Sequence, residues 1–155
     1  MPNDLPTLLA DWFSARNWAP HSHQLEMMDA AAAGRSALLI APTGGGKTLA
    51  GFLPSLVELI EADPAPVGLH TLYISPLKAL AVDIYRNLEI PIAEMKLPIR
   101  AETRTGDTPQ SKRQRQRRTP PQMLMTTPES LALLLSYEDA PAIFAQLRCV
   151  IVDEL

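Results

Sequence analysis

Short apolar runs alternate with amphipathic or polar segments along most of the 155-residue sequence, and this alternation constrains the fold more than any other feature. The apolar runs have the length of buried strands, and the segments between them have the length and periodicity of helices. Strands that are apolar on both faces belong to parallel sheets covered by helices. The sequence therefore predicts an α/β fold: a parallel sheet with helices on both faces.

The expected strands and helices follow one another in a regular order. Strands are predicted at residues 37–41, 70–75, 99–105, 122–127 and 149–154. Helices are predicted at residues 6–16, 22–33, 47–61, 77–89, 109–118 and 128–137. Most of the 15 prolines lie between the apolar segments, as expected of a residue that interrupts helices and strands. We expect a helical lead-in over residues 1–34 and one α/β domain over residues 35–155.

Composition excludes several classes of protein. Hydrophobic residues make up 46% and charged residues 20% of the chain, as in ordinary globular domains. No apolar run reaches the length of a membrane span, and the first residues lack the basic region of a signal peptide. The single cysteine, Cys149, excludes an internal disulfide and argues against a cysteine-based metal site. We therefore expect a cytoplasmic protein without a membrane partner.

The charge distribution limits how the chain could bind nucleic acid. The formal net charge is -3, so any such binding must come from a local basic patch. Residues 111–118, SKRQRQRR, are the candidate patch. We interpret this segment as the solvated face of a helix rather than as an element that reads bases.

Residues 41–48, APTGGGKT, have the spacing of a phosphate-binding loop (P-loop), with alanine in place of the usual first glycine. The loop follows a predicted strand and opens a predicted helix, which is the context that this motif requires. Glycine lets consecutive backbone N–H groups point at phosphate oxygens, lysine adds a positive charge, and the threonine hydroxyl can bind Mg²⁺. The expected nucleotide-binding residues are Ala41, Pro42, Thr43, Gly44, Gly45, Gly46, Lys47 and Thr48.

An acidic pair ends the last predicted strand and supplies the second half of such a site. Asp153 and Glu154 follow four apolar residues. In P-loop enzymes an aspartate at this position holds Mg²⁺, and a neighbouring glutamate can activate the attacking water. We predict Asp153 as the metal anchor and Glu154 as the general base, and together with Lys47 these are the expected catalytic residues.

The two motifs together resemble the first RecA-like domain of superfamily 2 DExH-box helicases. YISPLKALAVD (73–83) resembles motif Ia, TRTGD (103–107) resembles motif Ib, and TTPESL (126–131) resembles the next segment that contacts the nucleic-acid backbone. WAPHSHQ (18–24) is similar to the upstream element whose glutamine reads adenine. The stretches LYISPLKALAVDIYRNLE and TGDTP look most like the large helicase-related (Lhr) group, in particular its bacterial DNA-ligase-associated branch.

The resemblance implies ATP and Mg²⁺ as cofactors, with Gln24 as the residue that reads adenine through its amide. It also implies contacts to the nucleic-acid backbone at three turns between a strand and a helix, where backbone N–H groups can hold phosphate. The implied residues are Ser75, Pro76, Lys78, Thr105, Gly106, Thr127, Pro128, Glu129 and Ser130. For 75–78 and 127–130, simple helix capping is the alternative interpretation, and capping and binding can coexist.

The function implied by the resemblance is that of an ATP-dependent DNA helicase or translocase acting in DNA repair. Its expected partners are single-stranded DNA or a tailed duplex, and DNA-ligase-associated repair proteins. RNA stays open as a substrate, because contacts to phosphates do not reveal the sugar. A standalone P-loop NTPase or switch is the competing function class. The three turn motifs favour the helicase, because a metabolite kinase has no use for them at successive strand ends.

The sequence ends shortly after the acidic pair, and the resemblance implies what would come next. In the family a histidine follows the glutamate, and a second RecA-like domain supplies arginines to the transferring phosphate. A later strand also inserts between the P-loop strand and the strand that ends at Asp153. We expect the sheet to be incomplete at the C-terminus, and the 155-residue chain alone to be marginally stable or aggregation-prone and inactive in unwinding.

Overall fold

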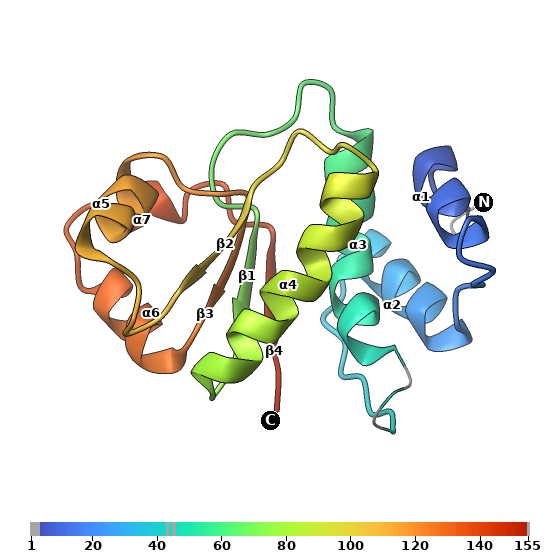
Figure 1. The fold of residues 1–155 in the computed structure, drawn as a ribbon, viewed down its shortest axis with the longest axis horizontal. Coiled ribbons are helices and arrows are strands. Elements are labelled where there is room, and N and C mark those ends of the chain that lie inside the picture. The colour runs from blue at the N-terminus through green and yellow to red at the C-terminus, as the bar shows by residue number, and fades with distance from the viewer. Residues whose placement is uncertain (1–3, 43, 45, 155) are drawn as a thin grey trace. The chain divides into compact units, whose positions relative to one another are not determined.

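The computed structural model describes residues 4–42, 44 and 46–154. The chain packs as two compact units, one within residues 1–63 and the other within residues 64–155. The first unit is helical, and the second contains a sheet with helices (Figure 1). The predicted boundary after residue 34 separates sequence elements rather than packed units, and it stays a prediction.

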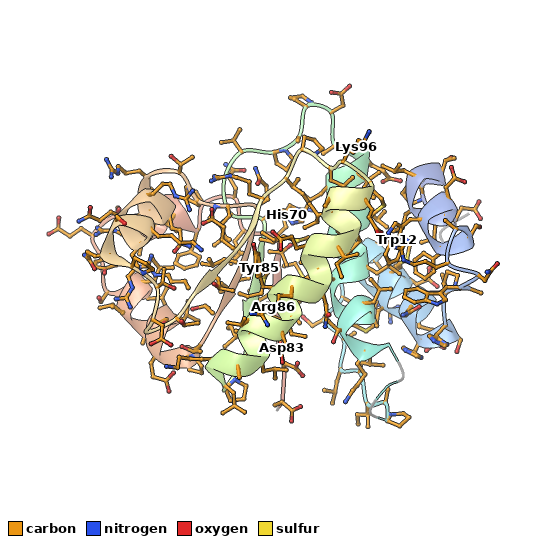
Figure 2. The ribbon with its side chains drawn as sticks, in the orientation of Figure 1. Trp12, His70, Asp83, Tyr85, Arg86 and Lys96 are labelled. Atoms are coloured by element: carbon orange, nitrogen blue, oxygen red, sulfur yellow. The ribbon has the colours of Figure 1, made fainter. Side chains whose placement is uncertain are left out.

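Three helices form the first unit: α1 (Thr7–Ser14), α2 (Ser22–Ala32) and α3 (Lys47–Glu61). Trp12 lies on α1 (Figure 2), and its ring packs edge-to-face against Phe13 and against Trp18 beyond the helix, with ring centroids 5.5 and 5.8 Å apart. Helix α3 has the bounds that the sequence predicts, and it packs against α2. Its buried side chains, such as Leu53 and Leu56, are the apolar face that makes this segment helical.

Residues 37–41 are not a strand, and this prediction was wrong. The segment has no regular secondary structure, and Leu38 and Ile40 are 70% and 87% exposed. A strand needs a neighbour that completes its backbone hydrogen bonds. Within the described ranges, every strand of the sheet lies in residues 71–152, and none of them pairs with 37–41.

The second unit is built on a four-stranded sheet. Its strands are β1 (Thr71–Ile74), β2 (Ala101–Arg104), β3 (Met123–Thr126) and β4 (Cys149–Val152). The order is β2-β3-β1-β4, and all three pairings are parallel. The sheet confirms the predicted α/β class, and each of its strands falls inside a predicted one.

Helices α4 (Lys78–Glu94), α5 (Gln110–Arg118), α6 (Pro128–Leu135) and α7 (Ala140–Ile143) complete the second unit. Leu134 of α6 and Ile143 of α7 pack with Leu72 and Leu124 in one apolar core. Met123 and Met125 alternate with Leu124 along β3 and so project from the opposite face. Helix α4 packs against β2 and β3 and crosses in front of the sheet in Figure 1, so helices cover both faces as predicted.

Among the described strands, β4 lies at an edge of the sheet. Its side chains Val150 and Val152 are 51% and 48% exposed, whereas all four residues of β3 are buried. Among the described strands, β4 has a strand neighbour on one side only, and Val150 and Val152 add exposed apolar side chains on one of its faces. Of the helices described here, none combines the length and the hydropathy needed to cross a lipid bilayer.

Candidate nucleotide and nucleic-acid sites

The glycine-rich loop of the first unit ends at the N-terminus of α3. Gly44 and Gly46 have φ angles of 83° and 74°, a left-handed conformation that glycine adopts without steric cost. Gly46 is the N-cap of α3, and among the residues that the structure describes no side chain caps this end. The first N–H groups of α3 are therefore available to an anion, which the predicted phosphate site requires. Lys47 and Thr48 are exposed beside them.

For the other predicted residues of the loop, the structure gives at most their exposure. Pro42 is exposed and Ala41 is partly buried. Thr43 and Gly45 were also predicted to bind phosphate, but they lie outside the described residues.

Gln24 lies against this loop. Its side chain is only 2% exposed, and its Nε2 donates to the carbonyl oxygen of Gly46 at 3.3 Å. Its Oε1 accepts from the N–H of His21 at 2.8 Å and so completes a capping box at the start of α2. The φ angle favours glycine at position 46, and a side chain there would place its Cβ 2.8 Å from the Gln24 Nε2, so the Gln24 amide would have to shift. The Gln24 amide keeps one N–H and one lone pair for adenine, and that role stays a prediction.

Asp153 follows β4 at the carboxyl end of the sheet, and both of its carboxylate oxygens accept hydrogen bonds. The Tyr73 hydroxyl donates to Oδ2 at 2.5 Å, and the N–H of Glu154 donates to Oδ1 at 2.9 Å. Tyr73 is the register partner of Ile151, two residues before Asp153, so both side chains project from the same face of the sheet. Burial of Tyr73 and its bond to Asp153 raise the pKa of the phenol, which therefore stays protonated and donates. Nothing in the sequence motifs singles out Tyr73.

The chemistry of these side chains fits the predicted metal. The Asp153 carboxylate and the Thr48 hydroxyl supply oxygen atoms, the ligands that Mg²⁺ prefers. Glu154 is exposed and has a φ angle of 57°, which is uncommon for a residue with a side chain. Strained backbone of this kind clusters at functional sites, so its position next to Asp153 accords with the predicted general base.

The three predicted nucleic-acid-binding turns meet at one pocket of about 450 Å³ in the second unit. We refer to it as the motif pocket. Of the predicted residues, it is lined by Lys78, Gly106, Thr127, Glu129 and Ser130. These residues come together because β1, β2 and β3 are neighbouring parallel strands, and the turns that follow them share one edge of the sheet.

The N-terminus of α6 has the cap that the sequence predicts. Thr127 is the N-cap, its side chain accepts from the N–H of Ser130, and Pro128 occupies the first helical position. Capping and lining of the motif pocket thus coexist at this turn.

Four predicted residues do not line the motif pocket: Ser75, Pro76, Thr105 and Pro128. Ser75 is buried, and its Oγ accepts from the N–H of Leu77 and donates to the Leu77 carbonyl, at 3.3 and 3.1 Å. Thr105 is also buried, and its Oγ1 accepts from the N–H of Asp107 at 3.3 Å. Both hydroxyls therefore shape the turns that carry the pocket residues.

Arg104 at the end of β2 lines the motif pocket and was not predicted. It is 1% exposed, and its Nη1 donates to the Arg113 carbonyl at 3.1 Å and to Gln116 Oε1 at 3.3 Å. Its Nη2 is buried and meets no acceptor at hydrogen-bond geometry within the described residues, although the Tyr137 side chain interacts with the guanidinium. Burial lowers the pKa of this guanidinium, because charge is costly away from water. A guanidinium among the lining residues gives the pocket a positive potential, which favours an anionic ligand.

Arg113 on α5 also lines the motif pocket, and it holds the turn after β2. Its Nη2 donates to the carbonyl oxygens of Thr105 and Gly106 at 3.0 and 2.8 Å. Gln116, on the same helix, is only 3% exposed, so the side of α5 toward β2 is not a solvated face. The sequence held a signal for the packing of α5 against β2. Glu102 and Arg104 stand two residues apart in a predicted strand, so their side chains project from the same face of the sheet.

Comparison with known proteins adds the family. The sequence pattern of the DEAD/DEAH box helicases matches residues 21–155. The chain belongs to the DEAD/DEAH box helicase family. The helicase interpretation is thereby confirmed over the standalone NTPase.

Individual helicases of the Lhr group are similar along nearly the whole chain, as the sequence predicts. The chain is 43% identical to the Lhr helicase/probable uracil glycosylase of Mycolicibacterium smegmatis, over 96% of this chain and 10% of that protein. It is 38% identical to the Lhr helicase/uracil glycosylase of Escherichia coli, over 100% of this chain and 11% of that protein. A solved structure of the Mycobacterium smegmatis helicase Lhr matches with a TM-score of 0.84 and 42% identity, over 96% of this chain and 20% of that one. The chain thus spans about a tenth of the length of these two curated relatives.

Proposed function

We propose that this DEAD/DEAH box helicase chain is the ATP-binding part of an Lhr-type DNA helicase or translocase. ATP binds at the loop 41–48, where Lys47 neutralises phosphate charge and Gln24 reads adenine. Mg²⁺ is held by Thr48 and Asp153, and Glu154 activates the attacking water. The uncapped N-terminus of α3 and the left-handed glycines before it support this assignment.

The motif pocket is the proposed site for the phosphate backbone of a single strand. The observation that carries this proposal is Arg104, a buried guanidinium that lines the pocket at the end of β2. Lys78, Arg113 and the Ser130 hydroxyl add donors around the same space. The helicase Lhr structure with 42% identity to this chain is described as bound to ssDNA and AMP-PNP, which supports both proposed ligands.

Such a site reads charge and shape rather than sequence. Its lining offers donors for phosphate, and contacts to phosphate carry no base information. We therefore expect weak binding that does not depend on base sequence and that weakens as salt rises, by about 0.7 in the logarithmic slope for each phosphate of a single strand.

DNA repair, alongside DNA-ligase-associated proteins, is the proposed setting of this activity. The support is the similarity of residues 72–89 and 105–109 to the ligase-associated branch of the Lhr group. Normal survival of a deletion strain after a panel of DNA-damaging treatments would count against this setting.

The experiment that tests the proposed function compares Lys78→Gln with Lys96→Gln in fluorescence-anisotropy titrations of an oligothymidylate. Both side chains are exposed, and only Lys78 lines the motif pocket. Its ion pair with Asp107, 2.9 Å long and exposed, contributes little to stability, so the fold should be unaffected. We expect Lys78→Gln to weaken binding about threefold to tenfold and to make the salt slope shallower, with no change for Lys96→Gln.

Equal affinities of the two variants would remove the motif pocket as the binding site. The same preparation should show no strand separation with ATP, because in this family the transferring phosphate also needs arginines from a second domain, worth about 10³–10⁵ in rate. Robust unwinding by the 155-residue polypeptide would contradict that part of the proposal.

A further inference from the structure

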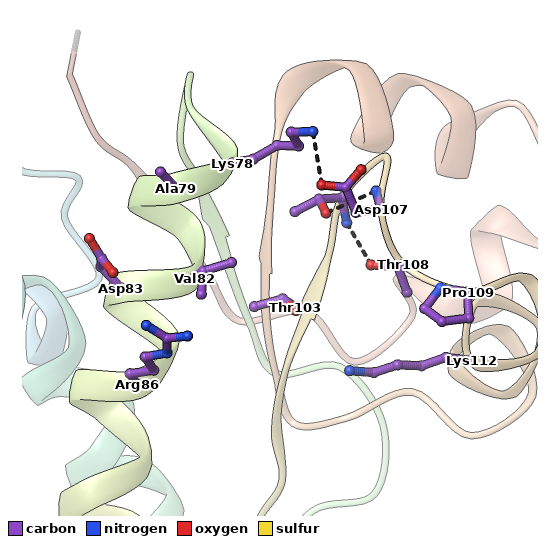
Figure 3. A pocket seen from close by; sticks show the side chains of 11 residues that line it. Lys78, Ala79, Val82, Asp83, Arg86, Thr103, Asp107, Thr108, Pro109 and Lys112 are labelled. Atoms are coloured by element: carbon purple, nitrogen blue, oxygen red, sulfur yellow. Dashed lines mark hydrogen bonds and ion pairs between the residues drawn. The ribbon is translucent and has the colours of Figure 1, made fainter.

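A second pocket lies beside the motif pocket, and Lys78 lines both. It has a volume of about 570 Å³ and lies between α4 and the segment that runs from β2 into α5 (Figure 3). We refer to it as the α4–α5 pocket. None of the helicase motifs accounts for its two outer cations, Arg86 and Lys112.

These two cations come from opposite walls of the α4–α5 pocket. Figure 3 shows Arg86 on α4 and Lys112 on α5 with Thr103 between them. Across the described part of the chain, neither side chain has a hydrogen-bond or ion-pair partner. Two unpaired positive charges that face one cavity favour an anion between them.

The neighbouring arginines of α5 show that Lys112 is different. Arg113 donates to backbone carbonyls, Arg115 to Glu102 at 2.8 Å, and Arg117 to Asp139 at 2.9 Å. Those three side chains hold α5 in place. Lys112 takes no part in these contacts and is directed to the pocket instead.

The acidic residues at the α4–α5 pocket do not neutralise its cations. Asp107 accepts from Lys78 at 2.9 Å, at the side where the two pockets meet. Asp83 also lines the pocket, three positions before Arg86, and Figure 3 draws it on the other side of α4 from Lys112. Within the described residues neither carboxylate forms an ion pair with Arg86 or Lys112, and the three cations of the lining, Lys78, Arg86 and Lys112, outnumber its two carboxylates.

Hydroxyl groups complete the set of donors. Thr105 Oγ1 and Thr108 Oγ1 each accept a backbone N–H, from Asp107 at 3.3 Å and from Thr105 at 2.9 Å. A hydroxyl that accepts in this way keeps its own proton for donation. Cations together with hydroxyl donors match a phosphate group. Among the described lining residues there is no aromatic ring on which a base could stack.

We propose that the α4–α5 pocket binds a further phosphate of the same strand whose backbone lies in the motif pocket, with Arg86 and Lys112 as its charged ligands. The shared Lys78 makes the two pockets neighbours along one path, so the strand can pass from one to the other. This inference rests on the proposed nucleic-acid binding of the motif pocket. It adds two phosphate-binding residues that lie outside the three turns.

The test measures binding of oligothymidylates of about 4 to 16 nucleotides, the range of site sizes of single-strand-binding folds. The Arg86→Gln/Lys112→Gln double variant is compared with Lys96→Gln/Arg118→Gln, which removes the same two charges from exposed positions that line neither pocket. Figure 2 shows Lys96 at the end of α4 opposite to Asp83 and Arg86. Circular dichroism confirms that both double variants keep the fold.

For the longest oligonucleotide we expect the Arg86/Lys112 variant to bind about threefold to tenfold more weakly than the control, with a salt slope shallower by about 0.7. If the Arg86/Lys112 variant and its control bind every oligonucleotide equally well, while Lys78→Gln weakens binding, this inference is overturned and the proposed function stands. If Lys78→Gln also has no effect on binding, both the inference and the proposed function are overturned.

Discussion

Tyr73 opens the segment that resembles motif Ia, yet no role was predicted for it, and its side chain contacts Asp153 directly. It is 2% exposed, and its hydroxyl donates to the carboxylate of Asp153, 80 positions away in the sequence. The register of β1 against β4 decides which residue of β1 reaches Asp153, and no sequence pattern predicts that register. The bond orients the carboxylate that we propose as a ligand of Mg²⁺.

We predict that Tyr73→Phe lowers the free energy of unfolding by about 1–2 kcal/mol, because it removes a buried hydrogen bond to a charged acceptor. Folding raises the pKa of Tyr73 above its ordinary value of 10.0, chiefly through burial and then through Asp153. This contribution is therefore fully present below about pH 10 and is lost as the pH rises through the folded-state pKa. Urea denaturation between pH 7 and pH 9 should show the same difference throughout.

Tyr85→Phe is the matched control for this prediction. Its hydroxyl also donates to a carboxylate, that of Glu89 at 2.8 Å, but the pair is on the surface. Such exposed pairs contribute less than about 0.5 kcal/mol. Equal effects of the two substitutions would show that the Tyr73–Asp153 bond adds nothing beyond a surface contact.

Among the helices and strands, the best-predicted segments are those in which the apolar pattern and the residues that mark the ends of the element agree. Helix α3 begins at Lys47 and ends at Glu61, as predicted, because a glycine-rich turn precedes an unbroken apolar face. Helix α4 runs past its predicted end at Glu89 and through Pro91, because Leu88, Pro91 and Ile92 continue the buried face. Helix α7 was not predicted, since four residues that include a proline show no period.

The wrong or missing predictions have one physical cause: a short stretch of sequence does not show which other segments pack against it in the fold. Residues 37–41 have the composition of a buried strand, yet Leu38 and Ile40 are exposed because no described strand lies beside them. Arg104 has a charged side chain of the kind that is usually exposed, yet α5 covers it. The motif pocket itself was foreseeable in part, because the turns after parallel strands meet at one edge.

The edge strand β4 gives a prediction at this scale. An apolar strand edge is a template for pairing with another chain, and an added lysine blocks such pairing. Val150→Lys should therefore raise the fraction of monomer in concentrated solution, measured by size-exclusion chromatography with light scattering. Ile90→Lys is the control, since Ile90 is likewise 51% exposed but lies on a helix. An equal gain from both variants would mean that general hydrophobicity, rather than the edge of β4, drives association.

At the scale of the whole molecule, one chain of the DEAD/DEAH box helicase family carries a proposed nucleotide loop in its first unit and a proposed nucleic-acid pocket in its second. Family membership is shown over residues 21–155. Binding of ATP by the loop 41–48 is the step on which every later step depends.

The most direct test of the central claim is calorimetric titration of ATP with Mg²⁺ into the wild-type protein, Lys47→Ala and the control Lys96→Ala. Lys47 is exposed at the uncapped end of α3, so its loss should leave the fold intact. We predict that Lys47→Ala weakens ATP binding by on the order of 1.5–3 kcal/mol, the range for a charge-assisted contact, and that Lys96→Ala has no effect. An unchanged affinity for ATP in Lys47→Ala would contradict the assignment of this loop, and with it the account of the chain as an ATP-driven helicase domain.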